Sequence, residues 1–190
     1  MKNLALMRMS VCALFAALLC VISPIAILIG PVPISLSVFA VLLSASLLGA
    51  IWGTVSVSLY LLLGALGLPV FGGGMAGFGA LLGPTGGFLW SYLIMSLMAG
   101  FGYRRIREKS TKGARWIGGL VTGTLSLIPC YLLGSFQYSL VANVSFLSAM
   151  AVCVLPFLIF DLCKIVLVCI IFERIMRIAD LRRVFFDLFG

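Results

Sequence analysis

The sequence predicts an all-α integral membrane protein with six transmembrane helices and both termini in the cytoplasm. Hydrophobic residues make up 63% of the 190 positions and charged residues only 9%, whereas about a quarter of a soluble domain is charged. The apolar runs lack the two-residue alternation of a transmembrane barrel, so helices are favoured. The net charge of +8 comes from basic residues that flank apolar runs, which indicates membrane topology rather than nucleic-acid binding.

A helix needs about 20 apolar residues to cross a bilayer, or fewer where it is short or re-entrant. The first apolar run follows Lys2 and Arg8 like a signal peptide, but more membrane segments come after it, so we interpret it as the first span. The second and third spans are short and are joined at residues 49–53. The expected spans are residues 4–27, 34–48, 51–66, 87–103, 116–138 and 151–176.

The number of spans follows from the basic residues, which favour the cytoplasmic side. They fall in three clusters, at residues 1–8, 104–115 and 174–183. An even number of crossings must separate each cluster from the next. If residues 34–66 formed one helix, the middle cluster would lie outside. Six spans place all three clusters inside and leave the outward connections uncharged.

The connection between the third and fourth spans is rich in glycine and poor in polar side chains. Residues 67–79 read GLPVFGGGMAGFG, and residues 83–87 read GPTGG. A solvated linker would carry more Ser, Asn and charge. Irregular backbone at membrane depth is tolerated where it is buried in protein or lines a cavity. We therefore expect this segment to cover an outward-facing pocket; the alternative is a compact external turn without a ligand.

Asp161 and Lys164 are the only charges between residues 116 and 172, and we expect them to be the only two that cannot reach water. Three residues apart, they share one face of the last helix. Each costs about 2.5–3.5 kcal/mol at mid-bilayer, part of which an ion pair recovers. Asp161 is expected about 15 Å from the outer helix end. The pair either joins this helix to its neighbours or forms the polar wall of a small-ligand pocket.

Several classes of site are excluded or disfavoured by the composition. The chain has no His, which removes His-based zinc sites and His-dependent hydrolysis. It has no phosphate-binding G-x-x-x-x-G-K-[ST] loop, and its six cysteines show no C-x-x-C spacing. We expect no metal, no cofactor and no enzymatic activity. On the first helix, Ala13 and Ala17 form a small-residue face that suits close packing against another helix, either internal or in a partner protein.

Three stretches carry a family resemblance. They are residues 30–36 (GPVPISL), the two glycine-rich stretches 67–74 and 82–88, and Pro156-Phe157 followed by the D-x-x-K pattern of Asp161 and Lys164. In this order, over nearly the whole chain, they resemble BioY, the biotin-binding S component of energy-coupling factor (ECF) vitamin importers. The chain departs from the common pattern at Ser37, where a longer polar residue is frequent, and at Phe88, where Tyr is common.

The resemblance implies a single transmembrane substrate-binding domain over residues 1–190, in a prokaryotic cell membrane, that binds biotin from outside. Uptake would require a transmembrane coupling protein and ATPase subunits, and Ala13 and Ala17 fit the A-x-x-x-A surface by which S components contact the coupling protein. The residues that the resemblance places around biotin are Asp161, Lys164, Phe71, Gly73, Gly74, Met75, Gly77, Phe78, Thr85 and Ser37.

Three alternatives remain open on the sequence. A stand-alone secondary transporter or facilitator could use Asp161 and Lys164 as a proton-linked pair, although the chain has no convincing inverted repeat. An intramembrane enzyme ranks last, because a single embedded carboxylate without His offers little acid–base chemistry. An S component for another vitamin would share most of these features.

Overall fold

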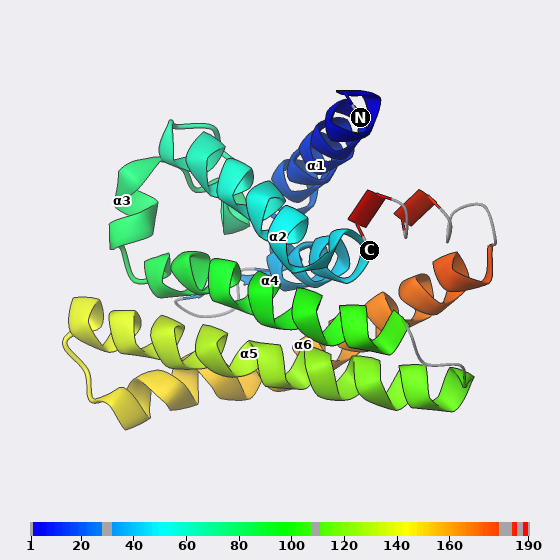
Figure 1. Ribbon diagram of the computed structural model, residues 1–190. Coiled ribbons are helices and arrows are strands. Elements are labelled where there is room, and N and C mark those ends of the chain that lie inside the picture. Colours follow the sequence, from blue (N-terminus) through cyan, green and yellow to red (C-terminus); the bar gives the residue numbers. More distant parts are fainter. Residues whose placement is uncertain (1, 28–31, 108–110, 179–183, 186–187, 190) are drawn as a thin grey trace.

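The computed structural model describes residues 2–27, 32–107, 111–178, 184–185 and 188–189 (Figure 1). Helices dominate this part of the chain, as the long apolar runs predict. A short two-stranded ribbon and a 3-10 turn, η1, accompany them. The elements in order are α1 (Lys2–Ile22), β1 (Ala26–Ile27), β2 (Ile34–Ser35), α2 (Ser37–Ala65), η1 (Gly72–Gly74), α3 (Gly77–Leu82), α4 (Gly86–Arg107), α5 (Lys112–Ala142) and α6 (Phe146–Arg177).

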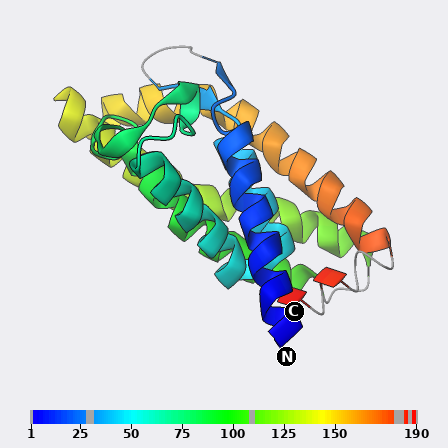
Figure 2. The ribbon, with the colours of Figure 1, turned by 90° about the horizontal axis from the view of Figure 1, so that it is seen from above.

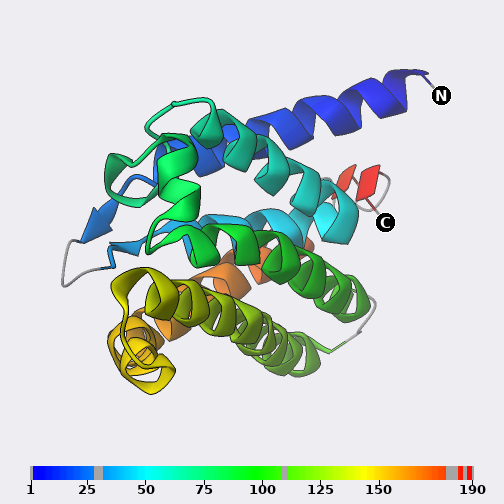
Figure 3. The same ribbon diagram turned by 90° about the vertical axis from the view of Figure 1, so that its left-hand side faces the viewer.

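Helix α2 is bent at Gly49, where the sequence predicts the break between the second and third spans. Gly49 has φ +76° and ψ −174° inside the helix, a conformation that only glycine adopts readily. β2 precedes α2 and η1 follows it, and these two elements contact each other. The two arms of α2 therefore run back alongside each other as a hairpin (Figure 3).

The two-stranded ribbon and the glycine-rich segment, residues 67–87, lie together at one end of the molecule. β1 pairs with β2 in antiparallel register, with Ala26 opposite Ser35, whereas the sequence predicts these residues as the end of the first span and the start of the second. η1 contacts both strands. The Gly73 amide donates to the Pro24 carbonyl over 3.3 Å. This end of the fold is thus closed by backbone contacts between segments that are far apart in the sequence.

The core lies between α2, α4, α5 and α6, while α1 lies at the periphery. α2 packs against α1, α4 and α6; α4 packs against α5, and α5 against α6. Figure 2 shows α1 lying across the near side of the molecule. Where α4 crosses the bend of α2, a Cβ at Gly100 would collide with the backbone of Ala50, so glycine at this position permits the close approach of the two helices.

Four helices of the described chain are long and apolar enough to cross a membrane: α1, α2, α5 and α6. The fold is therefore that of a helical, multi-pass membrane protein. Helix α6 begins at Phe146, five residues before the predicted start, with Ser145 as its N-cap. Asp161 consequently lies 15 residues beyond the helix start, or roughly 22 Å at 1.5 Å per residue, deeper than the sequence predicts.

The basic residues of the described chain gather at the end opposite the ribbon. Figures 1 and 3 place the start of α1, the end of α4 and the start of α5 at this end, together with residues 184–185 and 188–189. Arg104, Arg105 and Arg107 occupy the last turn of α4, and Arg174 and Arg177 the last turn of α6. The structure does not describe the side chains of Lys2, Arg182 and Arg183. The predicted clustering is thus found for the described residues.

Candidate functional site

A cavity lies beneath the glycine-rich segment, at the end of the fold that carries the ribbon. Its empty volume is about 550 Å³, including the part that is open to solvent. Its walls come from β2, α2, η1, α4, α5 and α6. The apolar wall consists of Val32, Pro33, Val38, Phe71, Met75, Phe88, Leu89 and Phe157, and the remaining lining of Ser35, Ser37, Gly72, Thr85, Tyr92, Cys130, Tyr131, Asp161 and Lys164.

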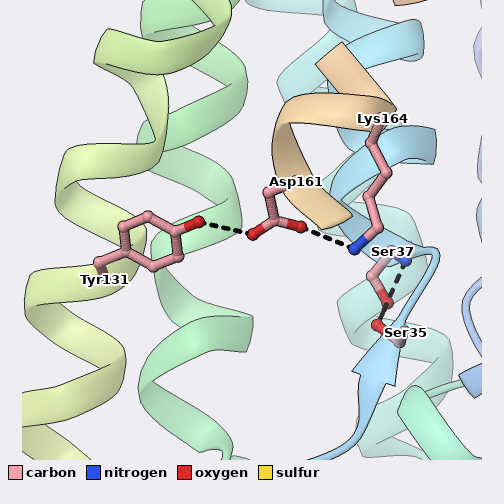
Figure 4. Close-up of polar contacts among 5 residues, drawn as sticks. All are labelled: Ser35, Ser37, Tyr131, Asp161 and Lys164. Atoms are coloured by element: carbon pink, nitrogen blue, oxygen red, sulfur yellow. Dashed lines mark hydrogen bonds and ion pairs between the residues drawn. The ribbon is translucent and has the colours of Figure 1, made fainter. Parts of the chain in front are cut away.

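Asp161 and Lys164 form an ion pair at the wall of this cavity, as their spacing predicts. The Lys164 Nζ lies 2.7 Å from Asp161 Oδ1, and the two residues are only 5% and 2% exposed, respectively. On the other side of the carboxylate, the Tyr131 hydroxyl of α5 donates to Oδ2 over 2.8 Å. Figure 4 shows the three side chains in a row, Tyr131, Asp161 and Lys164.

This row retains hydrogen-bonding capacity toward the cavity. A carboxylate accepts about four hydrogen bonds and an ammonium donates three. Among the described residues, Asp161 accepts one bond at each oxygen, and the Lys164 Nζ makes one, to Asp161. Acceptor and donor positions therefore lie side by side in an apolar surround, where a ligand that matches both is strongly preferred over one that matches neither.

Two serines add a second polar feature to the cavity wall. The Ser35 hydroxyl donates to Ser37 Oγ over 2.7 Å, and the Ser37 amide donates back to Ser35 Oγ over 3.3 Å. Ser35 ends β2 and Ser37 begins α2, and both line the same cavity as Lys164. These contacts fix the junction between β2 and α2, so the hydroxyl positions at the cavity are set by the local backbone.

The glycine-rich segment covers the cavity and is held there by specific contacts. Phe71 is fully buried, edge-on to Tyr60 with ring centroids 5.5 Å apart. Its ring fills the space where a side chain at Gly64 would lie. Further along, the Gln137 amide of α5 donates to the carbonyls of Leu81 (3.0 Å) and Gly83 (2.8 Å). The cover is therefore anchored to both α2 and α5.

The structure brings six of the ten predicted ligand-binding residues to the cavity: Asp161, Lys164, Phe71, Met75, Thr85 and Ser37. The other four belong to the covering segment but do not line the cavity. Gly73 and Gly74 are exposed in η1, Gly77 begins α3, and the side chain of Phe78 is 66% exposed.

The sequence interpretation missed Tyr131, Tyr92, Cys130 and Ser35 as lining residues. Tyr131 was detectable in principle, because a phenol within a long apolar helix needs a hydrogen-bond partner when it is buried. Its partner, Asp161, lies 30 residues further on, on a different helix. Only the packing of α5 against α6 brings the two together.

The expectation that Asp161 and Lys164 are the only charges shielded from water is wrong. Arg107 and Glu173 are each only 5% exposed. Arg107 reaches into the α2 bend and donates to the carbonyls of Ser46 and Leu47. Glu173 accepts hydrogen bonds from two nitrogens of the Arg115 guanidinium, Nε and Nη2. Position along the chain suggested that these charges are solvated, whereas the packing of the helix ends encloses them.

Ala13 and Ala17 lie on the outer surface of α1. Both are exposed, whereas the neighbouring Cys12, Ala16 and Leu19 are buried. The two alanines therefore take no part in the packing of α1 against α2. Of the two uses that the sequence leaves open for this face, internal packing does not occur in the described chain.

No cluster of three or more His, Cys, Asp or Glu side chains that could hold a metal ion occurs among the described residues. The six cysteines are free, and Cys130 is the one that lines the cavity. The candidate site thus consists of an ion pair, hydroxyls and apolar surface.

Comparison with known proteins agrees with this arrangement. The model of the BioY family matches residues 1–180. The chain belongs to the BioY family. It is 38% identical over 168 residues to the probable biotin transporter BioY of Pyrococcus horikoshii, which covers 88% of this chain and 95% of that protein. It is also 38% identical over 165 residues to the biotin transporter BioY of Thermotoga maritima, covering 87% and 93%.

A solved structure shares the fold. It is the S-component for biotin from an ECF-type ABC transporter, with a TM-score of 0.82 and 27% sequence identity. The match covers 93% of this chain and 94% of that one. The family and its relatives are transporters, and the helical membrane fold of this BioY chain corresponds to that of an S component.

Proposed function

We propose that this protein binds biotin from outside the cell, as the substrate-binding S component of an ECF-type importer. The observation that carries the proposal is the row of Tyr131, Asp161 and Lys164 at the wall of an apolar cavity. Biotin has the matching chemistry. Its ureido group presents N–H donors beside a carbonyl acceptor, and the fused ring and side chain are largely apolar.

In this assignment, Asp161 accepts the ureido N–H bonds through the lone pairs that Lys164 and Tyr131 leave available. Lys164 donates a remaining proton to the ureido oxygen and keeps Asp161 ionised and oriented. Phe71, Met75 and the other apolar lining residues cover the rings. A ligand without the ureido donors would leave a buried carboxylate short of partners, which is a strong source of selectivity.

The glycine-rich segment serves as the cover of the site in the same proposal. Gly73, Gly74, Gly77 and Phe78 take part through their backbone or by closing over bound ligand, because their side chains do not reach the cavity. Irregular backbone is tolerated at this depth, since it packs on protein over the cavity.

For the topology, we infer six membrane crossings in a prokaryotic cell membrane, with the two arms of α2 counted separately at Gly49. The basic end of the described chain then faces the cytoplasm, and the cavity opens outward. Transport requires an energy source, for which the sequence has no nucleotide-binding loop. A transmembrane coupling protein and ATPase subunits supply it, and the chain itself is not an enzyme.

The substrate half of the proposal is tested on the purified, detergent-solubilised protein. Mass spectrometry of the denatured sample should identify biotin as a co-purifying small molecule, and calorimetric titration of the ligand-free protein should show saturable, one-to-one binding of biotin. A different vitamin in the mass spectrum, together with no heat on adding biotin, would contradict the assignment and favour a sibling S component.

The partner half is tested at the exposed face of α1. Ala17→Trp adds a large side chain outside the packed core, so biotin affinity should stay within about twofold, while pull-down of the coupling and ATPase subunits should be lost. Leu62→Trp, at another exposed position on α2, is the matched control and should retain the complex. If cells without the coupling and ATPase subunits still take up biotin, and a protonophore abolishes that uptake, the stand-alone transporter is favoured instead.

A further inference from the structure

Tyr131 is a partly buried polar contact of the site whose hydrogen-bond partner, Asp161, the sequence does not identify. It lies on α5, lines the cavity, and directs its hydroxyl at Asp161 Oδ2 over 2.8 Å (Figure 4). Lys164 holds the opposite oxygen from one helical turn further along α6. The carboxylate thus accepts one hydrogen bond at each oxygen, from donors on two different helices.

These two hydrogen bonds fix the plane of the Asp161 carboxylate. The terminal torsion of an Asp side chain has a broad, roughly twofold energy profile, so a single contact to Lys164 would leave the plane free to rotate. Because Tyr131 anchors the second oxygen, rotation requires breaking a hydrogen bond to a charged group. The lone pairs that face the cavity therefore keep one direction before any ligand arrives.

We propose that Tyr131 is a positioning and specificity-determining residue, which orients Asp161 for N–H donors of the ligand; this rests on the proposed function. A phenol has a single proton, and here that proton is committed to Asp161. Toward the cavity the Tyr131 oxygen can only accept. The α5 side of the site consequently favours donor groups, such as a ureido N–H, and disfavours carbonyl or carboxylate oxygens in the same place.

The test compares Tyr131→Phe with Tyr138→Phe. Tyr138 lies two turns further along α5, is partly buried, does not line the cavity, and has no side-chain hydrogen bond within the described part of the chain. In Tyr131→Phe the carboxylate plane is no longer fixed in advance, so ordering it on binding should weaken biotin affinity by roughly three- to tenfold. The Tyr138→Phe variant should bind within about twofold of the unchanged protein.

A second measurement separates positioning from simple packing. The carboxylate stretching band of Asp161 is assigned in infrared difference spectra of the ligand-free protein by its disappearance in Asp161→Asn. In Tyr131→Phe this band should shift, because one oxygen loses its donor, while in Tyr138→Phe it should stay in place. Purely structural damage by the Phe substitution would not move a specific carboxylate band.

The outcomes are distinguishable from one another. Weaker binding with a shifted band supports the positioning role. Unchanged affinity in Tyr131→Phe overturns it and leaves the biotin assignment intact. Weaker binding with an unmoved band also overturns it, because Tyr131 would then act on the ligand or on packing rather than through Asp161. If the unchanged protein itself does not bind biotin, it is the proposed function that is wrong.

Discussion

The described part of the chain contains two ion pairs that are built in opposite ways. Glu173 of α6 accepts from both Nε and Nη2 of Arg115 on α5, at 2.9 and 2.7 Å. This bidentate pair joins two helices and uses the matched geometry of guanidinium and carboxylate. Asp161 and Lys164 lie one turn apart on the same helix, so their mutual contact joins no helices at all.

The two pairs also differ in their surroundings. The Arg115–Glu173 pair lies near the basic end of the molecule and lines no cavity described above, whereas the Asp161–Lys164 pair lines a cavity of about 550 Å³. A buried ion pair is weak evidence for stability, because desolvation offsets its attraction. The Lys164–Asp161 contact joins no two helices, and the only link of Asp161 to another helix is the single hydrogen bond from Tyr131 among the described residues; together with the cavity beside it, this favours a role toward a ligand. We therefore propose that the Arg115–Glu173 pair belongs to the scaffold and the Asp161–Lys164 pair to the ligand site.

The largest effect is expected for Asp161→Asn. The amide keeps the shape but removes the charge and half of the acceptor capacity, and it leaves Lys164 without its counter-ion. Biotin affinity should fall by about 100- to 1,000-fold, as measured by calorimetry. A monodisperse elution profile in detergent confirms that the variant is folded. Affinity within threefold of the unchanged protein would move this pair to the scaffold.

An intermediate effect is expected at the cover of the cavity, for Gly86→Ala. A methyl group at Gly86 would collide with the Leu81 carbonyl and the Gln137 side chain, so the end of α3 must move off its anchor. Biotin dissociation, followed by displacement of labelled biotin, should accelerate roughly tenfold, since changes at one interface act mostly on the off-rate.

Gly79→Ala is the matched control for this variant. Gly79 lies in α3 itself, and a methyl group there would meet nothing within 4 Å. Its dissociation rate should stay within about twofold of the unchanged value. Equal rates in both glycine variants would show that the cover does not limit release.

The smallest effect on binding is expected for Glu173→Gln, at the scaffold pair. The neutral amide cannot form an ion pair with Arg115. The free energy of unfolding should therefore fall by about 1–3 kcal/mol, which should lower the thermal unfolding midpoint by several degrees. Biotin affinity should remain within about twofold. A loss of affinity as large as that in Asp161→Asn would mean that the two pairs cannot be divided by role.

Local sequence signals predicted the features of this fold that depend on neighbouring residues. The break in α2 was predictable because Gly49 and Gly53 interrupt an apolar run and because the basic clusters require an even number of crossings. Asp161 and Lys164 were predictable as a pair because three residues correspond to nearly one helical turn. The cover was predictable because residues 67–87 combine glycine with large apolar side chains rather than with charge.

Features that depend on packing between distant segments were not predictable in this way. The contact between Tyr131 and Asp161 requires the register of α5 against α6, and the enclosure of Glu173 requires the same. Whether Gly73, Gly74, Gly77 and Phe78 line the cavity depends on how η1 and α3 fold back, which composition does not determine. The short β1–β2 ribbon likewise arises from contacts across the end of the molecule.

The most direct test of the central claim is an experimental structure of the protein with biotin bound. The distances between the ureido nitrogens and the Asp161 oxygens should be about 2.7–3.2 Å, with the Lys164 Nζ at a similar distance from the ureido oxygen. Biotin elsewhere in the protein, or with its ureido group turned away while Asp161 contacts only Lys164 and Tyr131, would contradict the account.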